Sequence, residues 1–566
     1  MTRKNKILNK FILIAFYLVL ASAFLSCSNS ALTQRVYLEL NFDDSRINNR
    51  FAIKNQPLEI FTVIEKAAND DRVIGIILNI ANISAERDHL WELRTALERF
   101  KSGGKKIVAY IGYADMDIYL LASVADRIVM HELGGLSITG YSLGRGFMKN
   151  TFEKLGIGVN ELRYFEYKTA AESFSRDSFS AADRRQLNEY LDDVFNLSRS
   201  TLMQARNWTE QEFNNIINNE FLYSAKAAEE KGLVDYVGGF KEVELAIYKL
   251  EETNDNVFAL YGRQETSLTA SSLTYTPPRT QGGSPIIAIV YADGQTDMTR
   301  GMDAVRISRT IRSLANNSQI KAIVLRVNSP GGSAEAADYV NEAVRYAKIY
   351  KPVVVSMGST AASGGYWVSM SANHIVANPF TITGSIGVIG TWFYDNGLNS
   401  KVGVNIETIK RGAHSDLNTG FIVPYRNLTP LEEERYKNYI TDLYNIFTEK
   451  VLSSRYTKDI DINRAAQGRI FSGIRALEEN LVDSIGGLTE AIQIARELAD
   501  IPDEQNVQYR KFPELKFFEK LLESMNTSKS VFFGIDINPL FNSDLKYRLE
   551  TNGQVMPILP LDFMIN

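Results

Sequence analysis

Two glycine-rich turns in the second half of the chain carry the residues best suited to acyl-transfer chemistry. The first is Asn328-Ser-Pro-Gly-Gly-Ser333, which follows an apolar run that ends at Val327. Gly331 and Gly332 can adopt positive φ and allow close backbone approach. Consecutive unhindered N–H groups after a strand suit an oxyanion hole, although an ordinary strand-to-helix turn has the same composition. No Gly-Lys-Ser/Thr follows, which argues against a phosphate-binding loop.

The second turn contains a candidate nucleophile, Ser363. It lies in Gly358-Ser-Thr-Ala-Ala-Ser-Gly-Gly-Tyr-Trp367, after an apolar run and before an expected helix. A serine between small residues at such a turn can present its Oγ beside helix N–H groups. The alternative is that Ser359 or Ser363 only caps the helix.

A serine nucleophile needs a base, and the residue types leave several open. The chain has four histidines. Among them, His374 lies in a segment that matches the first half of the chain, and only His414 is a serious candidate. A lysine can also act as the base if burial disfavours its ammonium form. Composition alone does not choose among the lysines.

Composition excludes several other kinds of protein. The 566 residues include 62 basic and 67 acidic side chains, for a net charge of −5, which argues against a nucleic-acid partner. Cys27 is the single cysteine, so the chain can form no internal disulfide and no multi-cysteine metal site. No two histidines stand at metal-ligand spacing. We expect neither a metal nor a cofactor.

Strands and helices alternate along both halves. Apolar β-branched runs predict strands at Ile107–Ile111, Ile320–Val327 and Val353–Ser356. Fully apolar strands between helices indicate a sheet covered on both faces, and therefore an α/β fold. Two sets of residues fall on single helical faces: Leu90, Leu93, Leu97 and Phe100, and Val340, Ala343, Val344 and Ala347.

The two halves also repeat each other. Matching segments follow in the same order, two pairs at an offset of 247 residues and one at 244, which indicates a tandem duplication. The pairs are Val73–Ile80 with Ile320–Val327, Ala125–Val129 with Ala372–Val376, and Ser137–Gly140 with Thr381–Gly384.

The repeat and the local composition predict the domain organisation. An N-terminal domain spans 36–263 and a C-terminal domain spans 286–500. Residues 264–285 are rich in Thr, Ser, Gly and Pro, which is typical of a linker. The tail 501–566 has apolar and aromatic content of its own, and we expect it to pack on the second domain.

The first 27 residues predict export and membrane attachment. Basic residues precede an apolar run from Phe11 to Leu25, the pattern of an export signal. Cys27 follows in Phe24-Leu25-Ser26-Cys27, which resembles a lipoprotein processing site and makes this cysteine a candidate for lipidation. The alternative is a retained transmembrane anchor. Either interpretation places residues 28–566 outside the cytoplasm.

Together these motifs resemble the signal peptide peptidase A family, in its long tandem-repeat form. The resemblance rests on Ser329-Pro-Gly-Gly, on the turn around Ser363, on Thr383-Gly-Ser385-Ile-Gly and on Tyr167-Lys168-Thr-Ala. It covers roughly residues 36–566. It implies an α/β fold of two tandem domains of the Clp protease and crotonase type, built from repeated ββα units.

The resemblance also implies roles for particular residues. Ser363 would be the nucleophile and Lys168 its general base, with Ser385 orienting the lysine. The N–H groups of Gly331 and Gly364 would form the oxyanion hole. Thr169 departs from the family, in which serine often follows the lysine.

The repeat is compatible with one site shared by both halves. An offset of 247 pairs Ser363 with Met116 and Lys168 with Ser415, so each half lacks what the other keeps. Such complementary loss is expected when one site draws on both halves, and it is also compatible with neutral drift.

The function that the resemblance implies is a membrane-attached serine endopeptidase with a Ser/Lys dyad. Its substrates would be released signal peptides and other extended apolar peptides. It would act on the extracytoplasmic side of a bacterial cell membrane as a homo-oligomer, in this family a tetramer. The alternatives are a crotonase-like acyl-thioester enzyme, a non-catalytic peptide-binding scaffold, and a serine peptidase that pairs Ser363 with His414.

Overall fold

The structure is a computed structural model of the whole chain. It describes residues 36–42, 57–252, 284–503, 505–513, 531–532, 535–536, 551–559 and 564–565. The chain divides into two compact units. The first unit comprises Met1–Ala85, Leu93–Thr139 and Leu202–Tyr275, and the second comprises Glu86–Glu92, Gly140–Thr201 and Thr276–Asn566.

These units have different bounds from the predicted domains. Residues 140–201 belong to the second unit, although the repeat assigns them to the N-terminal domain. The reason is strand pairing, because β6 (Ile157–Leu162) lies antiparallel to β14 (Ile389–Asp395). Lys168 and Ser363 therefore lie in the same compact unit. Most of the predicted linker 264–285 lies outside the described residues.

The first unit is built on a mostly parallel sheet in the order β1-β2-β3-β4-β7, with β8 beside β4. Strands β1 to β4 are parallel and β7 is antiparallel to β4. The strands of this unit are β1 (Val36–Asn41), β2 (Val73–Asn79), β3 (Lys106–Ala114), β4 (Arg127–Ser137), β7 (Leu222–Ser224) and β8 (Tyr236–Val237). Its helices are α3 (Pro57–Ala68), α5 (Met116–Ala122), α9 (Glu210–Asn215), η1 (Ile216–Glu220), α10 (Ala225–Glu230) and α11 (Phe240–Leu250), and α4 (Arg87–Ser102) begins in the second unit.

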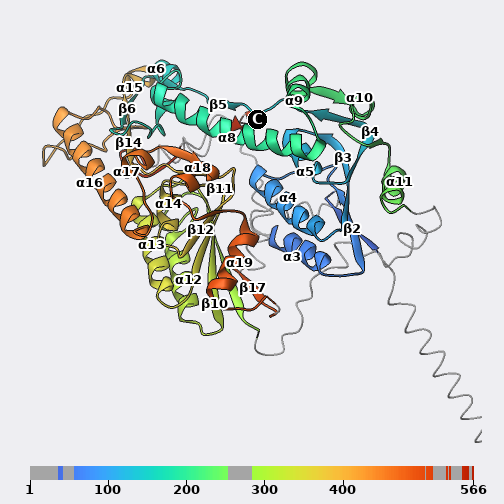
Figure 1. Cartoon of the computed structure of the whole chain (residues 1–566). Helices are drawn as coiled ribbons and strands as arrows, with labels where there is room; N and C mark the ends of the chain where they lie inside the picture. The colour runs from blue at the N-terminus through green and yellow to red at the C-terminus, as the bar shows by residue number, and fades with distance from the viewer. Residues whose placement is uncertain are drawn as a thin grey trace, which may run out of the picture. The chain divides into compact units, whose positions relative to one another are not determined.

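The second unit has a larger sheet in the order β15-β13-β11-β10-β9-β17, with β12 between β11 and β16. Figure 1 labels β10, β11, β12 and β17 of this sheet. Neighbouring strands are parallel except for β15, which is antiparallel to β13. The strands are β9 (Ile286–Asp293), β10 (Ile320–Ser329), β11 (Val353–Ala362), β12 (His374–Ala377), β13 (Ile382–Gly384), β15 (Ile470–Ser472), β16 (Ser484–Ile485) and β17 (Gln508–Phe512). The helices that follow them are α12 (Ala304–Asn316), α13 (Ala334–Lys348), α14 (Gly364–Ser369), α15 (Leu398–Val402), α16 (Pro430–Ser454), α17 (Ile462–Ala465), α18 (Gly473–Glu478) and α19 (Leu488–Leu498).

A smaller antiparallel sheet in the order β20-β14-β6 completes the second unit. The strand β20 (Val555–Met556) pairs with β14, and β21 (Met564–Ile565) pairs with β5 (Leu143–Gly144). Helices α6 (Lys149–Leu155), α7 (Glu172–Ser175) and α8 (Ala181–Arg206) belong to the same region, and α8 runs on into the first unit. A separate pair joins β18 (Val531–Phe532) to β19 (Ile535–Asp536).

The order of elements confirms the tandem α/β fold. The series β1-α3-β2-α4-β3-α5-β4 in the first half has the same order as β9-α12-β10-α13-β11-α14-β12 in the second. The matched segments at offset 247 begin β2 and β10, and they overlap β4 and β12. The predicted strands at 107–111, 320–327 and 353–356 lie within β3, β10 and β11.

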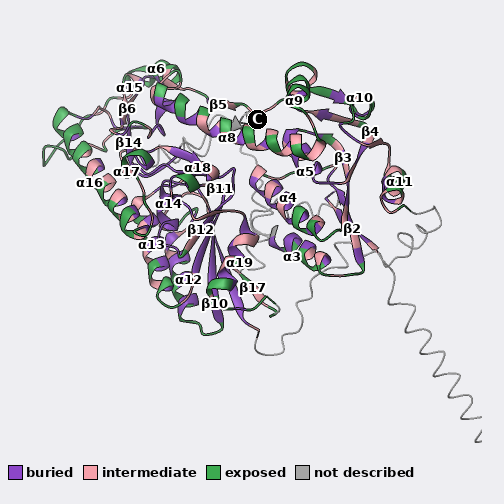
Figure 2. Cartoon of the chain, in the orientation of Figure 1, coloured by how far each residue is buried: buried purple, intermediate pink, exposed green. Residues whose placement is uncertain are grey.

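The sheet of the second unit is buried on both faces, as its apolar strands predict. On β9, Ile286 and Ala288 pack with α12 and α13 in one core, while Ile287 and Ile289, whose side chains point to the opposite face, are buried as well. Figure 2 shows the strands of this sheet in purple, the colour of buried residues. Helix α19 packs against β10 and β11.

A buried ion triad ties the start of α4 to this sheet. Arg326 on β10 lies 2.8 Å from Glu92 and 3.2 Å from Asp88, and all three side chains are buried. Burial raises the pKa of Glu92, and the Arg326 charge opposes that shift. Since each carboxylate depends on the same guanidinium, loss of Arg326 would leave two buried charges uncompensated.

The predicted membrane attachment lies outside the described residues, since these begin at Val36. This applies to the export signal at 1–27 and to lipidation of Cys27. Among the described residues, no helix combines the length and the apolar character needed to cross a membrane.

Candidate active site

Ser363 stands between β11 and α14 in a strained backbone conformation. Its φ is 58° and its ψ is −112°, which non-glycine residues rarely adopt. Its N–H donates to the Gly384 carbonyl at 2.8 Å, which holds the turn in place. The side chain does not cap α14. Ser359, the other serine of this turn, lies within β11 and donates to Asn328 Oδ1 at 2.9 Å.

Lys168 brings its amine to this serine. The Nζ atom donates to Ser363 Oγ at 2.6 Å, and to both the carbonyl oxygen and the Oγ of Ser385 at 2.9 Å. Lys168 is 1% exposed, and both serines are equally inaccessible. Ser385 has a φ of 50°, and its N–H donates to the Arg469 carbonyl. The structure thus brings Ser363 and Ser385, two residues that the family resemblance implies, to the amine of Lys168, the third.

A polar network fixes the backbone on both sides of Lys168. The Tyr167 N–H donates to the Gln467 carbonyl at 3.0 Å, and Thr169 Oγ1 donates to Asp183 at 2.7 Å. Gln186 also donates to Thr169 Oγ1, at 3.1 Å. Thr169, which departs from the family pattern, is therefore hydrogen-bonded within the network beside Lys168.

Asp183, which accepts from Thr169, is itself buried and paired with a charge. Its second oxygen accepts from Arg145 at 2.6 Å, and neither side chain is exposed. Burial raises the pKa of the Asp183 carboxyl, while the Arg145 charge opposes that shift. Gln186, on α8, links this network to β15, because its side-chain oxygen accepts from the Ile470 N–H.

Gly468 allows the lysine to approach. Its φ is +81°, and its N–H donates to the Ile386 carbonyl at 2.8 Å. A Cβ at this position would lie 2.5 Å from Lys168 Cβ and 2.6 Å from Lys168 Cα. Ordinary van der Waals contact begins near 3.4 Å. Only glycine leaves the Lys168 backbone in its present place.

Two N–H groups near Ser363 converge on one carbonyl oxygen. Gly364, the residue after the serine, donates to the Pro557 oxygen at 3.1 Å, and Gly332 donates to the same atom at 2.9 Å. The Gly331 N–H instead donates to Ser329 Oγ at 3.3 Å. The two glycines of the first turn have φ of +99° and +149°, which aims their N–H groups in different directions. The convergent pair is therefore Gly332 with Gly364, not Gly331 with Gly364.

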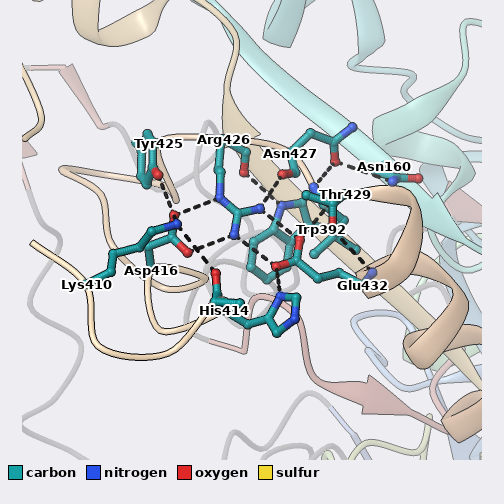
Figure 3. A network of polar contacts seen from close by, with 12 residues as sticks. Asn160, Trp392, Lys410, His414, Asp416, Tyr425, Arg426, Asn427, Thr429 and Glu432 are labelled. Atoms are coloured by element: carbon teal, nitrogen blue, oxygen red, sulfur yellow. Dashed lines mark hydrogen bonds and ion pairs between the residues drawn. The ribbon is translucent and has the colours of Figure 1, made fainter. Parts of the chain in front are cut away.

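His414 belongs to a different polar network (Figure 3). Its Nδ1 lies 2.7 Å from Glu432, which also accepts from Arg426 at 2.8 Å. Arg426 bonds Asp416 as well, and these hydrogen bonds lower the pKa of both carboxyls. His414 is half exposed. The amine of Lys168, rather than this imidazole, lies beside Ser363.

Several residues of the site were not named from the sequence. They are the network residues Arg145, Asp183 and Gln186, and the close-approach residue Gly468. No sequence signal sets these residues apart, because their contacts depend on how the chain folds and not on residue type or spacing. Within the described part of the chain, no group of three or more His, Cys, Asp or Glu side chains is placed to hold a metal ion.

Comparison with known proteins finds one family model in both halves of the chain. The family model for peptidase family S49 matches residues 99–254 and again residues 345–502, and the model for Clp protease matches residues 293–378. The chain is 31% identical to the chloroplastic serine protease SPPA of Arabidopsis thaliana over 447 residues, which is 77% of this chain and 65% of that protein. It is 30% identical to Protease 4 of Haemophilus influenzae over 80% of this chain and 75% of that protein.

A solved structure of a ClpP1 mutant from Listeria monocytogenes aligns with 36% of this chain and 94% of that one, at 15% identity and a TM-score of 0.24. The assignment rests on the family models and on the sequence relatives. Both halves match the same peptidase model, and each relative aligns over more than three quarters of this chain. The chain belongs to peptidase family S49, a family of serine peptidases.

Proposed function

We propose that this protein is a membrane-attached serine endopeptidase in which Ser363 and Lys168 form the catalytic dyad. Its substrates would be cleaved signal peptides and other extended apolar peptides. The observation that carries the proposal is the 2.6 Å hydrogen bond between Lys168 Nζ and Ser363 Oγ, both buried. A buried amine of this kind suits general-base chemistry, because burial disfavours the charged ammonium form.

In the proposed reaction, the neutral amine of Lys168 takes the proton of Ser363 as Oγ attacks the substrate carbonyl carbon. The proton then passes from Nζ to the nitrogen of the departing amine as the peptide bond breaks. An acyl-enzyme remains on Ser363. Lys168 next takes a proton from water as the water oxygen attacks the acyl carbon. The bond from that carbon to Ser363 Oγ then breaks, Oγ takes the proton back from Nζ, and the acid product leaves with the serine and the neutral amine restored.

The oxyanion of each tetrahedral intermediate would be bound by the N–H groups of Gly332 and Gly364. These donors already converge on one carbonyl oxygen, at 2.9 and 3.1 Å, which is the spacing such a hole requires. Gly332 takes the place that the resemblance assigned to Gly331. Because both donors are backbone groups held by neighbouring turns, they need no reorganisation during the reaction.

Ser385 would act as a positioning residue. Its carbonyl oxygen and its Oγ both accept from Lys168 Nζ, which turns the amine toward Ser363. Thr169 and Asp183 hold the backbone beside the lysine. The strained φ of Ser363 fits this picture, since strain of this kind gathers where geometry has a function.

The cellular setting is part of the same proposal. The basic and apolar start of the chain would attach the protein to a bacterial cell membrane, through a lipid on Cys27 or through a retained transmembrane segment. The peptidase would then work on the extracytoplasmic side, as a homo-oligomer of the tetrameric kind that the family resemblance implies. Neither a metal nor a cofactor takes part in the proposed chemistry.

Hydrolysis of fluorogenic apolar peptides by the purified chain tests the dyad. Lys168→Met keeps the length of the side chain but removes the amine, and it should lower kcat/KM by roughly 10²–10⁴-fold. Ser363→Ala should lower it at least as far. Lys226→Met is the matched control, because this lysine is 84% exposed on α10. Wild-type activity in a folded Lys168→Met protein would overturn the dyad.

A further inference from the structure

Residues 555–559 form a segment beside Ser363 that begins with the strand β20 (Val555–Met556). On one side, Val555 and Met556 pair antiparallel with Gly390 and Ile389 of β14. On the other side, Ile558 forms an antiparallel bridge with Gly331 in the glycine turn. A hydrogen bond from the Leu559 N–H to the Pro330 carbonyl, at 2.8 Å, continues this second pairing. The segment is thus held between two strand edges, as a bound peptide is in β-augmentation.

The carbonyl of Pro557 occupies the proposed oxyanion hole. Its oxygen accepts from Gly332 and Gly364 at 2.9 and 3.1 Å. A Cβ on Gly331 would lie 2.2 Å from this oxygen and 3.1 Å from Ser363 Cβ, which places the carbonyl next to the serine. The segment therefore presents the peptide bond between Pro557 and Ile558 in the position of a substrate bond.

The side chains of this segment fill an apolar subsite. Met556 and Ile558 are buried together with Ala170, Ala171 and Ile389. Both alanines follow Lys168 closely in the sequence, and their small side chains leave room for the bulkier residues of the strand. The groove is complementary to an extended peptide that carries apolar residues immediately before and after the residue whose carbonyl enters the hole.

Residues just before the strand anchor it. Asn552 accepts from the Phe393 N–H at 2.8 Å and donates to the Phe393 carbonyl at 2.9 Å. The Gly553 N–H donates to the Thr391 carbonyl at 3.1 Å. A strand tethered so close to the groove has an effective concentration on the order of millimolar. A free peptide with the same contacts must reach that concentration to displace it.

We propose that residues 555–559 are an intramolecular competitor of substrate, which regulates the site by occupying its peptide-binding groove. This proposal rests on the proposed function, because the groove is that of the Ser363 site. The segment has to leave before another peptide can bind. If the open state is populated to ~10% or less, freeing the groove raises the apparent affinity for substrate about 10-fold or more.

Two variants open the groove in different ways. Truncation after Gly553 removes the strand and keeps its anchor. Ile558→Asp places a charge at a fully buried apolar position, which should expel the strand. Gln554→Asp is the matched control, because it adds the same charge to an exposed residue directly before the segment. Both opening variants should raise kcat/KM for an apolar fluorogenic peptide about 10-fold or more, chiefly through KM, while the control should leave it unchanged.

A binding measurement separates this proposal from the proposed function. Each chain is prepared with Ser363→Ala, and fluorescence anisotropy then measures the Kd of a labelled synthetic peptide with the sequence of residues 553–559. Tighter binding after truncation supports the competitor. Equal Kd values in folded full-length and truncated chains overturn it. Tighter binding by the truncated chain, with no hydrolysis by any chain that retains Ser363, instead refutes the peptidase function and leaves the groove occupancy standing.

Discussion

Replacing Gly468 with alanine would test how closely Lys168 must be placed. The new Cβ would lie 2.5 Å from Lys168 Cβ, against an ordinary contact distance of about 3.4 Å, so the lysine must retreat by about 0.9 Å. The nearest atoms include the lysine's Cα and N, at 2.6 and 2.7 Å, so rotation of the side chain cannot relieve the contact. A misplacement of about 1 Å at a reacting group can lower the rate by ~10²-fold.

Gly104→Ala is the control for this experiment. Gly104 has a φ of +82°, almost the same as the +81° of Gly468, but a Cβ there meets nothing within 4 Å. Both variants carry the cost of an alanine at positive φ, which is about 1–2 kcal/mol. Only the variant at 468 displaces the lysine.

Two assays on the purified variants decide the outcome. Hydrolysis of a fluorogenic apolar peptide gives kcat/KM, and thermal unfolding gives the stability of each protein. We expect Gly468→Ala to lower kcat/KM by ~10²-fold and Gly104→Ala to retain the wild-type value. A Gly468→Ala protein with wild-type kcat/KM would refute the requirement for close placement.

Two further predictions concern stability. Arg326→Met should lower the free energy of unfolding by about 3–5 kcal/mol, because it strands two buried carboxylates. The control Arg345→Met, at an exposed arginine, should change the free energy of unfolding by about 0.5 kcal/mol or less. If urea unfolding shows the same loss of stability in both variants, the buried triad does not stabilise the fold as described. Burial raises the pKa of Asp483, but hydrogen bonds and charge from Arg455 outweigh this and lower it to about 2. The ionised Asp483 should therefore add about 2 kcal/mol to the free energy of unfolding above pH 4, and this stabilisation should disappear as the pH falls toward 2. If an Asp483→Asn protein loses stability in acid to the same extent as the wild type does, Asp483 makes no such contribution.

Much of the fold follows from residue patterns. The apolar runs that predict strands become β3, β10 and β11, because such runs need burial on both faces. The helical faces at Leu90–Phe100 and Val340–Ala347 are buried as their spacing predicts. Residue patterns do not predict the unit to which residues 140–201 belong. The repeat assigns these residues to the first half, whereas strand pairing places them in the second unit. Periodicity describes local burial and carries no information about such pairings.

The repeat offset also slips by one residue at Ser363. A constant offset of 247 pairs Ser363 with Met116, but the residue just before α5 is Asp115. Asp115 has a φ of −83° and caps its helix by accepting from the Ile118 N–H. Ser363 has positive φ and makes no cap. The same place in the repeat thus serves a structural purpose in one half and presents a strained hydroxyl in the other.

The candidate site was only partly accessible from sequence. Ser363 stands out because small residues surround it at a turn. Lys168 does not stand out among the lysines by its residue type, and only the family resemblance identifies it as a candidate base. Its close neighbour Gly468 belongs to a segment far along the chain, and no local pattern predicts that contact. The choice between Gly331 and Gly332 depends on backbone angles, which two adjacent glycines do not reveal.

Labelling with a fluorophosphonate probe tests the central claim most directly. The probe reacts with an activated serine, and mass spectrometry of the digested protein locates the adduct. In the chain truncated after Gly553, the adduct should form on Ser363, and Lys168→Met should slow its formation by roughly 10²-fold or more. An adduct on a different serine, or labelling of Ser363 at the same rate without the lysine amine, would contradict the Ser363–Lys168 dyad.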